Sequence, residues 1–555
     1  MTEGFIDDEV DVCVVGSGAG GAPIAHALSR AGARVVVLEK GPWYQHEDFN
    51  HDEIATARRD MWVPFVSEEP HLQKNGDGPA FKTANGWIAR CVGGGTVHMS
   101  GYFYRLHPED FRLGTRYGRL PGANVADWPI EYDDLAPYYD RVEQVIGVSG
   151  EAGENPFEPP RSGPYPLPPV ATNDLARLVE QGAKKLGWHP FQVPRAVLSR
   201  PYRGRRACVY CDFCGSYGCE VGAKSSTLAS LIPEAVATGR CEVRPDSMAF
   251  EIAVDRSGRA RAVRYRDARG EQRQQRARVI CVAASAVESA RLLLNSRSSR
   301  FEAGLANGSG LVGQNLTFST LAKGFGEFER GKLPKLLRPT PSNHFLDRAI
   351  QDHYLLKDRD GEYDKGGTLH YILPHRNPIF TAERLARRHD PMLWGAALSR
   401  EIMRYHTEVH QIEFELFGEF LPNPRTFVSV DGSIEDKWGI PVATIHHTPH
   451  PESRKNAAIL AERGIDLLKA AGADDTWTQD VGGTTYVLQH GTCRFGKDPE
   501  TSVLNPDCRA HEVDNLYVTD GSFMPTSGGV PTTLTILANA FRVADHLIGR
   551  FQRKD

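Results

Sequence analysis

The feature that most constrains the fold lies at the start of the chain, where a short apolar stretch runs directly into a glycine-rich turn. Residues 9–15 read EVDVCVV and are followed by GSGAGG, so Gly16, Gly18 and Gly21 satisfy the pattern GxGxxG. The first glycine allows a tight turn, the second lets a pyrophosphate approach the backbone, and the third lets a helix pack on the strand. This stretch therefore predicts a strand, turn and helix that bind a dinucleotide.

The residues that follow supply the helix and a second strand. Residues 22–32 place apolar side chains at helical spacing before Gly32, and the free N–H groups at the start of this helix would face the phosphates. The next strand, in ARVVVLEKG, ends at Glu39, whose carboxylate could accept hydrogen bonds from both ribose hydroxyls. An acid with no arginine directly after it fits FAD or NAD better than NADP, and the motif does not choose between those two.

Length and charge exclude several classes of protein. A chain of 555 residues is too long for one ordinary core, so two large domains, or one with a large insertion, are expected. Its 65 basic and 70 acidic residues leave no basic surface for nucleic acid, and its apolar runs are too short to span a membrane. Residues 1–11 are acidic and lack a secretory signal pattern, which predicts a cytoplasmic protein, or a periplasmic one if a partner subunit exports it.

Four of the ten cysteines, namely Cys208, Cys211, Cys214 and Cys219, gather in the segment CVYCDFCGSYGC. In a reducing compartment such a cluster indicates metal or redox chemistry before structural disulfides. Thiolates two residues apart can converge on one ion or cluster, so an iron–sulfur cluster, zinc and uncomplexed thiols all stay open. The other six cysteines are scattered, mostly in apolar stretches, and are interpreted as buried packing residues.

Three further segments carry a resemblance to a known family. They are RCVGGGTVHMSGYFYR (90–105), VICVAASAVESARLLLNS (279–296) and the C-terminal stretch that begins GTCRFGKDPETSVLNPDC at 491. Together with the first turn they resemble the glucose-methanol-choline (GMC) family of FAD-dependent oxidoreductases, especially its bacterial sugar-dehydrogenase and pyranose-oxidase-like branches. The resemblance touches both ends and the middle of the chain, whereas residues 320–480 show no recognisable pattern.

The resemblance implies an α/β (α+β) fold with two domains. A Rossmann-like FAD-binding domain would be assembled from residues 1–110, 200–320 and 480–555, with the cysteine cluster in its second part. Residues 111–199, which include a proline-rich connector, and 321–479 would form a substrate domain with an antiparallel sheet over the flavin ring.

The resemblance also assigns cofactor contacts. By position they are Gly94, Gly95, Thr96, His98, Asp520 and Gly521. In pyranose oxidases the histidine that corresponds to His98 is covalently joined to the flavin, so His98 either forms that link or only packs against the ring. In bacterial sugar dehydrogenases a similar cysteine cluster holds iron and sulfur, although here Glu220 stands where a proline usually follows the last cysteine.

Alcohol oxidation requires a base that takes the hydroxyl proton, and histidine has a suitable pKa. Members of the family that this chain resembles commonly carry a histidine in an HxxGT motif and an asparagine or histidine in a later NP segment. This chain has Leu488 and Pro531 at those two positions. His490 lies two residues further on, on the same face of an extended strand, and is the candidate base; the alternative is a histidine that hydrogen-bonds a loop. Asn539, on the last helix, is the nearest polar candidate to orient the alcohol, or else an amide satisfied within the fold.

That last helix, from about Thr532, would direct its N-terminus at the pyrimidine edge of the flavin, where its dipole stabilises the negative charge of the reduced ring. The sequence thus predicts FAD-dependent oxidation of a secondary alcohol in a sugar, glycoside or cyclic polyol, with electrons passed to a small subunit or cytochrome if the cysteines hold a cluster. The alternatives are an oxidase that uses dioxygen on a sterol-like alcohol, and a family member with non-oxidative, lyase-type chemistry.

Overall fold

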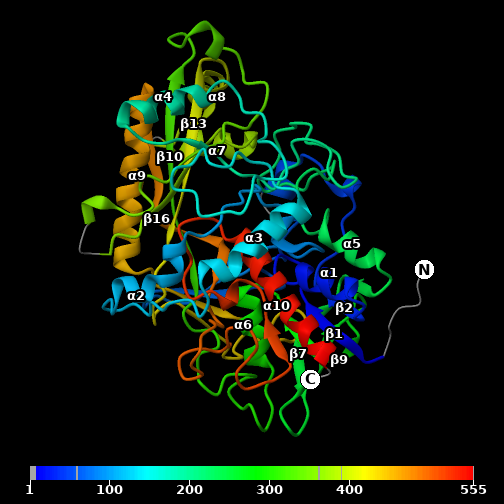
Figure 1. Cartoon of the computed structure of the whole chain (residues 1–555). Helices are drawn as coiled ribbons and strands as arrows, with labels where there is room; N and C mark the ends of the chain where they lie inside the picture. The colour runs from blue at the N-terminus through cyan, green and yellow to red at the C-terminus, as the bar shows by residue number, and fades with distance from the viewer. Residues whose placement is uncertain (1–7, 58–60, 360–362, 389, 554–555) are drawn as a thin grey trace.

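The computed structural model describes residues 8–57, 61–359, 363–388 and 390–553. The first seven residues of the acidic N-terminal stretch therefore lie outside the described residues. The described chain forms three sheets with helices packed around them (Figure 1).

The first sheet has a parallel centre. Its order is β6–β2–β1–β9, with β17 beside β9, and the strands are β1 (Val10–Val15), β2 (Val35–Leu38), β6 (Cys241–Arg244), β9 (Gln272–Val282) and β17 (Leu516–Val518). Strands covered on both faces need nearly continuous apolar runs, which is what VDVCVV in β1 supplies. An antiparallel hairpin, β7 (Met248–Val254) and β8 (Ala260–Arg266), extends the sheet beyond β9.

Helices from distant parts of the chain cover this sheet. Figure 1 places α10, at the C-terminal end of the chain, beside α1 and the N-terminal strands, and α1 and α10 are in contact. These helices are α1 (Ala22–Arg30), α3 (Tyr132–Ile146), α5 (Leu231–Ala237), α6 (Ala286–Asn295) and α10 (Thr533–Arg553). The parallel sheet is therefore built from the N-terminal, middle and C-terminal parts of the chain.

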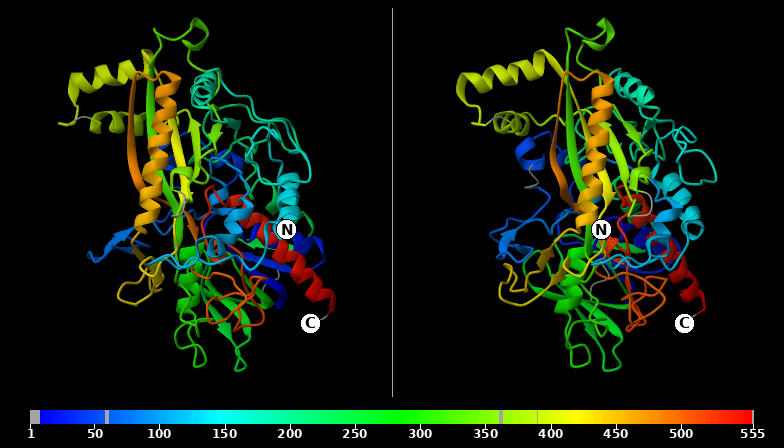
Figure 2. Two further views of the ribbon diagram at one scale, coloured as in Figure 1. Left: turned by 60° about the vertical axis from the view of Figure 1, so that its left-hand side comes forward. Right: turned by 90° about the vertical axis from the view of Figure 1, so that its left-hand side faces the viewer.

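The second sheet is antiparallel, in the order β16–β10–β13–β12–β11–β5. Its strands are β5 (Phe191–Gln192), β10 (Thr317–Glu329), β11 (Arg348–Ile350), β12 (Gly367–Ile372), β13 (Val409–Glu419) and β16 (Asp475–His490). The long helix α9 (Pro451–Ala471) runs along this sheet, and α4 (Ala176–Leu186) packs on α9 (Figure 2). Gly464 allows this close approach, because a Cβ there would lie 2.5 Å from the Phe414 ring.

A smaller third sheet joins segments from both predicted domains. It pairs β3 (His71–Asn75) and β4 (Phe81–Thr83) with β14 (Phe427–Ser429) and β15 (Thr444–His447). The remaining helices are α2 (Leu113–Tyr117), α7 (Pro378–Arg387) and α8 (Gly395–Thr407), and Figure 2 shows α7 and α8 standing out from the end of the second sheet. Among the described residues, none of the helices is both long enough and apolar enough to cross a membrane.

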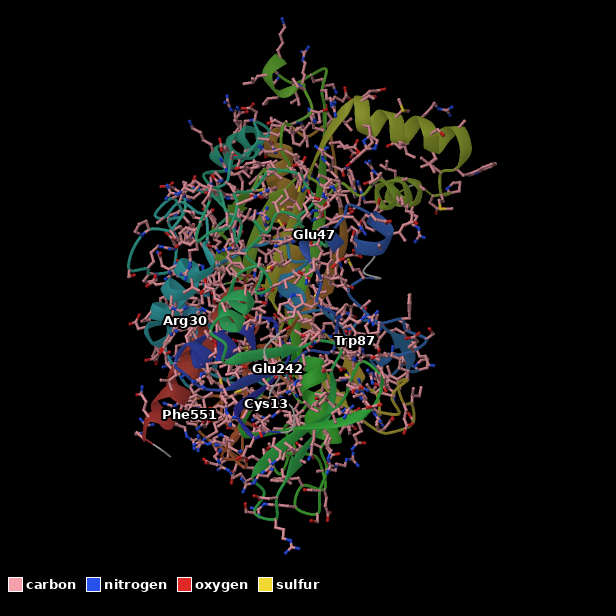
Figure 3. The ribbon with its side chains drawn as sticks, turned by 90° about the vertical axis from the view of Figure 1, so that its right-hand side faces the viewer. Cys13, Arg30, Glu47, Trp87, Glu242 and Phe551 are labelled. Carbon is pink, nitrogen blue, oxygen red and sulfur yellow. The ribbon has the colours of Figure 1, made fainter. Side chains whose placement is uncertain are left out.

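The predicted fold class is confirmed: a Rossmann-like unit made of discontinuous segments is combined with an antiparallel sheet. The domain bounds stay predictions, and β10 and β16 run across the bounds placed at 320 and 480. The six scattered cysteines are all buried, as expected, and Figure 3 marks Cys13 inside the nucleotide-binding half. Burial raises the pKa of the Cys13 thiol to about 12, so this group is an unreactive packing residue.

The third glycine of the first turn generates a stability prediction. A Cβ at Gly21 would lie 2.0 Å from the carbonyl oxygen of Gly16, whereas one at Gly18 would meet nothing closer than 3.7 Å. We expect Gly21→Ala to lower the free energy of unfolding of the apoprotein by about 1–3 kcal/mol through overpacking. Gly18→Ala is the matched control and should leave the urea midpoint of the apoprotein unchanged; equal losses in both variants would contradict the packing role of Gly21.

Candidate active site

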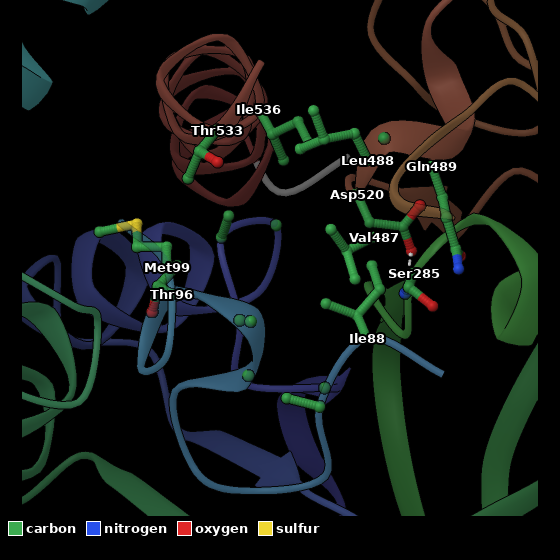
Figure 4. Close-up of a pocket in the computed structure, with 18 of the residues that line it drawn as sticks. Ile88, Thr96, Met99, Ser285, Val487, Leu488, Gln489, Asp520, Thr533 and Ile536 are labelled. Atoms are coloured by element: carbon green, nitrogen blue, oxygen red, sulfur yellow. Dashed lines mark hydrogen bonds between the residues drawn. The ribbon is translucent and has the colours of Figure 1, made fainter. Parts of the chain in front are cut away.

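A cavity of about 460 Å³ lies between the parallel and the antiparallel sheets. One wall consists of the first glycine turn, residues around Gly94 and Asp520, and the start of α10; strands β10, β13 and β16 contribute the other. Figure 4 shows the part of the cavity where α10, with Thr533 and Ile536, faces Leu488. Segments that are hundreds of residues apart therefore meet around one space.

The predicted dinucleotide end of the cavity is lined by bare backbone. Gly16 has φ +97°, and a Cβ there would lie 2.3 Å from the carbonyl oxygen of Ala283. Gly94 has φ +53°, and its Cβ would lie 3.0 Å from the Cα of Gly18. The backbone of Gly18, Ala19 and Gly20 lines the cavity just before the start of α1, so the turn has the form of a pyrophosphate cradle.

Two predicted carboxylates are fixed beside this cradle. Glu39, at the end of β2, accepts hydrogen bonds from Ser17 N (3.1 Å), Ser17 Oγ (2.7 Å) and Gly41 N (3.1 Å). Burial raises the pKa of Glu39, and these hydrogen bonds oppose the shift. Asp520 accepts a hydrogen bond of 3.1 Å from Ser285 N, drawn in Figure 4. Both carboxylates line the cavity and stand where ribose and ribityl hydroxyls of a dinucleotide would need acceptors.

The GGGT segment is tied to the first turn by hydrogen bonds. Ser17 Oγ accepts from Gly93 N (2.9 Å), and Thr96 Oγ1 donates to Gly93 O (2.6 Å). Thr227, which the sequence reasoning missed, donates from its N–H to Thr96 Oγ1 (3.0 Å) and from its hydroxyl to Ser17 O (3.1 Å). The position of Thr227 shortly after the cysteine cluster is the only local signal for it. Gly94, Gly95 and Thr96 line the cavity, and Gly521 does so beside Asp520.

His98 also lines the cavity, with its ring stacked on Trp62 at a centroid distance of 5.5 Å. Its Nε2 lies 3.2 Å from the carbonyl oxygen of Ile88, and since a carbonyl can only accept, Nε2 carries the proton in this contact. Its own carbonyl accepts a 2.8 Å hydrogen bond from Ser216 N. His98 is thus held by the cysteine-containing segment as well as by Trp62.

His490 lies at the cavity, at the end of β16 and near Leu488. Its Nε2 is 2.6 Å from the hydroxyl of Thr532, and only 1 % of the residue is exposed. Burial lowers the pKa of His490 to about 3, opposed only by the backbone of Phe318. Leu488 and Pro531 line the cavity at the two positions where the family motifs carry polar side chains, and neither can take a proton.

Asn539 does not reach the cavity, which corrects the prediction that it orients the alcohol. Its side chain is fully buried, donates to Cys508 Sγ (3.2 Å) and accepts from Arg542 Nε (3.0 Å). Asn539 lies one turn beyond Ile536, the last residue of α10 that lines the cavity, or about 4.5 Å further along the helix axis. The amide is satisfied within the fold, which was the alternative interpretation.

The antiparallel sheet contributes charged side chains that the sequence reasoning missed. Lys323 on β10 and Glu415 on β13 are directly opposite in the register, with Nζ 3.2 Å from a carboxylate oxygen. His375, in the loop after β12, lines the same cavity. All three lie in the stretch without a recognisable motif, and only strand pairing brings them together. We call Lys323, Glu415 and His375 the polar wall.

The four clustered cysteines lie in one loop, residues 208–219, which we call the cysteine loop; its Gly215 and Ser216 line the cavity. Two thiol sulfurs accept backbone N–H groups, Cys208 from Tyr210 (3.3 Å) and Cys219 from Lys224 (3.4 Å). A single tetrahedral zinc ion would need its sulfurs about 3.8 Å apart.

The cysteine loop does not form such a zinc site. Among the residues that the structure describes, the one group of at least three metal-ligand side chains within 4.8 Å of one another is His51, Cys211 and Glu220, with one thiol only. The buried Lys224 ammonium instead holds the loop, donating to the carbonyls of Met99, Cys214 and Tyr217 at 2.6–2.9 Å. A four-thiolate zinc site is therefore not formed here, while an iron–sulfur cluster, whose ligands stand further apart, stays a prediction.

Comparison with known proteins places this site in a family. Residues 82–320 and 422–540 match the two family models for GMC oxidoreductases, and residues 14–43 match an NAD(P)-binding Rossmann-like domain. The chain is 32 % identical over 560 residues to 2-methyl-1,2-propanediol dehydrogenase of Mycolicibacterium austroafricanum, covering 98 % of this chain and 96 % of that one. It is also 32 % identical to 6'''-hydroxyparomomycin C oxidase of Streptomyces lividus, covering 99 % and 93 %.

Among solved structures, pyridoxine 4-oxidase from Mesorbium loti superimposes with a TM-score of 0.62 at 17 % identity, covering 97 % of this chain and 99 % of the other, which supports the fold alone. The family models cover more than half of the chain. The chain belongs to the GMC oxidoreductase family and is an oxidoreductase. The family binds FAD, and the glycine cradle with Glu39 and Asp520 fits that cofactor.

Proposed function

We propose that this protein oxidises a secondary alcohol of a sugar, glycoside or cyclic polyol with FAD as the hydride acceptor. The observation that carries the proposal is the continuity of the cavity, which runs from the glycine cradle to the polar wall of the antiparallel sheet. A substrate hydroxyl group needs such donors and acceptors, because an unpaired buried hydroxyl is costly. The similarity to a dehydrogenase of 2-methyl-1,2-propanediol and to an aminoglycoside oxidase supports an alcohol substrate with several polar groups. Because that diol has only a primary and a tertiary hydroxyl, the similarity supports the alcohol class and not the secondary position.

Each part of the chain has a role in this proposal. The first turn and the start of α1 bind the pyrophosphate, while Glu39 and Asp520 accept hydrogen bonds from hydroxyls of the cofactor. The cavity-lining residues Thr532 and Thr533 mark the N-terminus of α10, whose dipole favours the negative charge that a flavin gains on reduction. Bound FAD supplies the two-electron chemistry, and the protein's own side chains must manage the hydroxyl proton.

A second candidate function follows from Leu488 and Pro531. These apolar residues occupy both family positions at the cavity, as a protein with FAD-bound, non-oxidative chemistry could tolerate.

His490 was the predicted base. With its Nε2 engaged by Thr532 and a pKa of about 3, it is a weak proton acceptor. The role proposed for His490 is therefore that of a neutral hydrogen-bonding group near the flavin.

The first experiment is anaerobic mixing of the yellow holoprotein with a panel of sugars, polyols and simple secondary alcohols. We expect at least one polyhydroxylated compound to bleach the flavin, which lowers its absorbance near 450 nm. Added NAD should not change the rate or extent of this bleaching. A protein that stays fully oxidised with every alcohol in the panel, while retaining FAD, would favour the non-oxidative alternative.

The route by which electrons leave the flavin depends on the cysteine loop. We propose that Cys208, Cys211, Cys214 and Cys219 hold an iron–sulfur cluster that passes single electrons to a carrier protein, which would make the enzyme a dehydrogenase. Two observations support this: N–H groups directed at the sulfurs, and the contact of the loop with the cavity. We expect anaerobically purified protein to contain iron and acid-labile sulfide, and Cys214→Ser to lose both. Protein free of both would instead reoxidise its flavin with dioxygen and be an oxidase.

His98 decides how the FAD is attached. A link through Nε2 would have to break the contact with the Ile88 carbonyl, and the ring is already stacked on Trp62. We therefore propose that His98 packs against the flavin without a covalent link. Acid precipitation should release the yellow colour into the supernatant, and His98→Asn should weaken FAD retention. A pellet that stays yellow in the wild-type protein but not in His98→Asn would establish the covalent alternative.

A further inference from the structure

Alcohol oxidation in this cavity needs a proton acceptor, and the positions considered so far do not provide a good one. Leu488 and Pro531 are apolar. The Nε2 of His490 is engaged by Thr532, and although its Nδ1 is also buried without a partner among the described residues, burial lowers the pKa of His490 with only the backbone of Phe318 opposing it. An acceptor should lie in the cavity, have an available ring nitrogen or carboxylate, and have neighbours that stabilise its charged form. The polar wall on the opposite sheet meets these conditions.

We propose that His375 is the residue that accepts the substrate's hydroxyl proton, with Glu415 and Lys323 binding a second hydroxyl of the same substrate. The base would thus be carried by the antiparallel sheet and its following loop, and not by the C-terminal segment. This inference rests on the proposed function, because it assigns the proton transfer of that reaction.

The first support is the placement of the His375 ring. Nδ1 of His375 is buried and has no hydrogen-bond partner among the described residues, although the residue lines the cavity. A buried, unpartnered nitrogen is costly unless a ligand or water completes it. The ring lies directly over Gly215 of the cysteine loop, since a Cβ there would be 2.4 Å from Cε1 and 2.7 Å from Nε2 of His375.

The second support is the way the loop that carries His375 is anchored. Arg376 forms a 2.7 Å ion pair with Asp212, and Asn377 accepts a 2.8 Å hydrogen bond from the hydroxyl of Tyr217. Both partners belong to the cysteine loop. The two residues that follow His375 are therefore anchored to the cysteine loop, which helps to hold the ring at the cavity, as a general base requires.

The third support is electrostatic. The charged and titratable groups that act on the ring are His344, whose ring stacks on it at 5.4 Å, with Glu413, Glu415, Lys323 and Arg195. Burial lowers the pKa of His375, while Glu415 and Glu413 raise it and Lys323 and Arg195 lower it. Burial likewise raises the pKa of Glu415, but Lys323 and two histidines outweigh it and keep this carboxylate ionised. An imidazolium at His375 therefore has a carboxylate nearby, which His490 lacks.

The charge of the wall also indicates the class of substrate. Lys323 Nζ contacts Glu415 of the polar wall (3.2 Å) and also Glu413 (2.6 Å), a neighbouring carboxylate that does not line the cavity, so the ammonium and these two carboxylates together carry a net charge of −1. Such a wall offers donors and acceptors to hydroxyls and repels an anion. The substrate we infer is a neutral or cationic polyhydroxy compound, such as a polyol or amino sugar, and not a sugar acid.

In the proposed proton transfer, the O–H bond of the substrate breaks and its proton binds a nitrogen of neutral His375, which becomes an imidazolium. The hydrogen on the carbon that bears this hydroxyl would leave with its electron pair, FAD would supply the acceptor for this hydride when bound, and the C=O bond of the product would form. The imidazolium then loses its proton to solvent, which restores the neutral base.

The test measures anaerobic flavin reduction as a function of pH in the holoprotein, with the best neutral polyol found for the wild type. Since neutral His375 is the active form and burial lowers its pKa, the rate should fall only at a pH below the ordinary histidine range and reach a plateau above it. His375→Asn should reduce the plateau rate on the order of 100- to 10,000-fold and abolish this acidic limb. Glu415→Gln should move the limb to lower pH, because the carboxylate that raises the pKa of His375 is removed.

Three further variants separate proton transfer from folding. Gly215→Ala keeps the imidazole but displaces the ring, and should slow flavin reduction without loss of FAD; Gly163→Ala, where a Cβ meets nothing within 4 Å, is its matched control. His490→Asn should keep the acidic limb. The inference is overturned if His375→Asn, with normal FAD content, keeps the wild-type rate and limb, or if only His490→Asn loses them. If no alcohol reduces the wild-type flavin, the proposed function itself fails.

Discussion

The close backbone contact around the first glycine turn determines where every other part of the site lies. Gly16 lies against Ala283 and Gly20 against Asp520, while Ser17 binds Gly93, so three distant segments converge on the turn. None of these contacts leaves room for a side chain at the two glycines. The turn therefore places the cofactor cradle and also fixes the end of β9, the GGGT segment and the start of the C-terminal segment around it.

The parts of the site that could be predicted from the sequence are those whose residues lie close together along the chain. The glycine turn, Glu39 at the end of β2 and the strand before α6 all depend on spacings within about thirty residues. Gly94, Thr96, His98 and Asp520 were placed by resemblance, and all of them line the cavity. His490 also lines the cavity, but its role as a base stays a prediction, because its chemistry depends on burial and on Thr532, which a strand pattern cannot give.

The parts that could not be predicted depend on non-local pairing. Lys323 and Glu415 are neighbours only because β10 and β13 pair in one register, and a shift of one residue in either strand would send its side chain to the other face. His375 follows β12 in a loop with no motif, so its position depends on contacts with the cysteine loop. Asn539 failed for a simpler reason, because distance along a helix axis carries a residue away from a site at its N-terminus.

The cysteine loop has a consequence that is independent of what its thiols bind. Gly215 supports the ring of His375, and the next residue holds the carbonyl of His98, so one dipeptide bridges the cofactor side and the substrate side of the cavity. In a lineage that lost all four thiols, selection for catalysis would still act on this backbone. Position 215 should then remain glycine in homologues in which serine or alanine replaces the cysteines, because the shape of the loop and its thiols would be under separate selection.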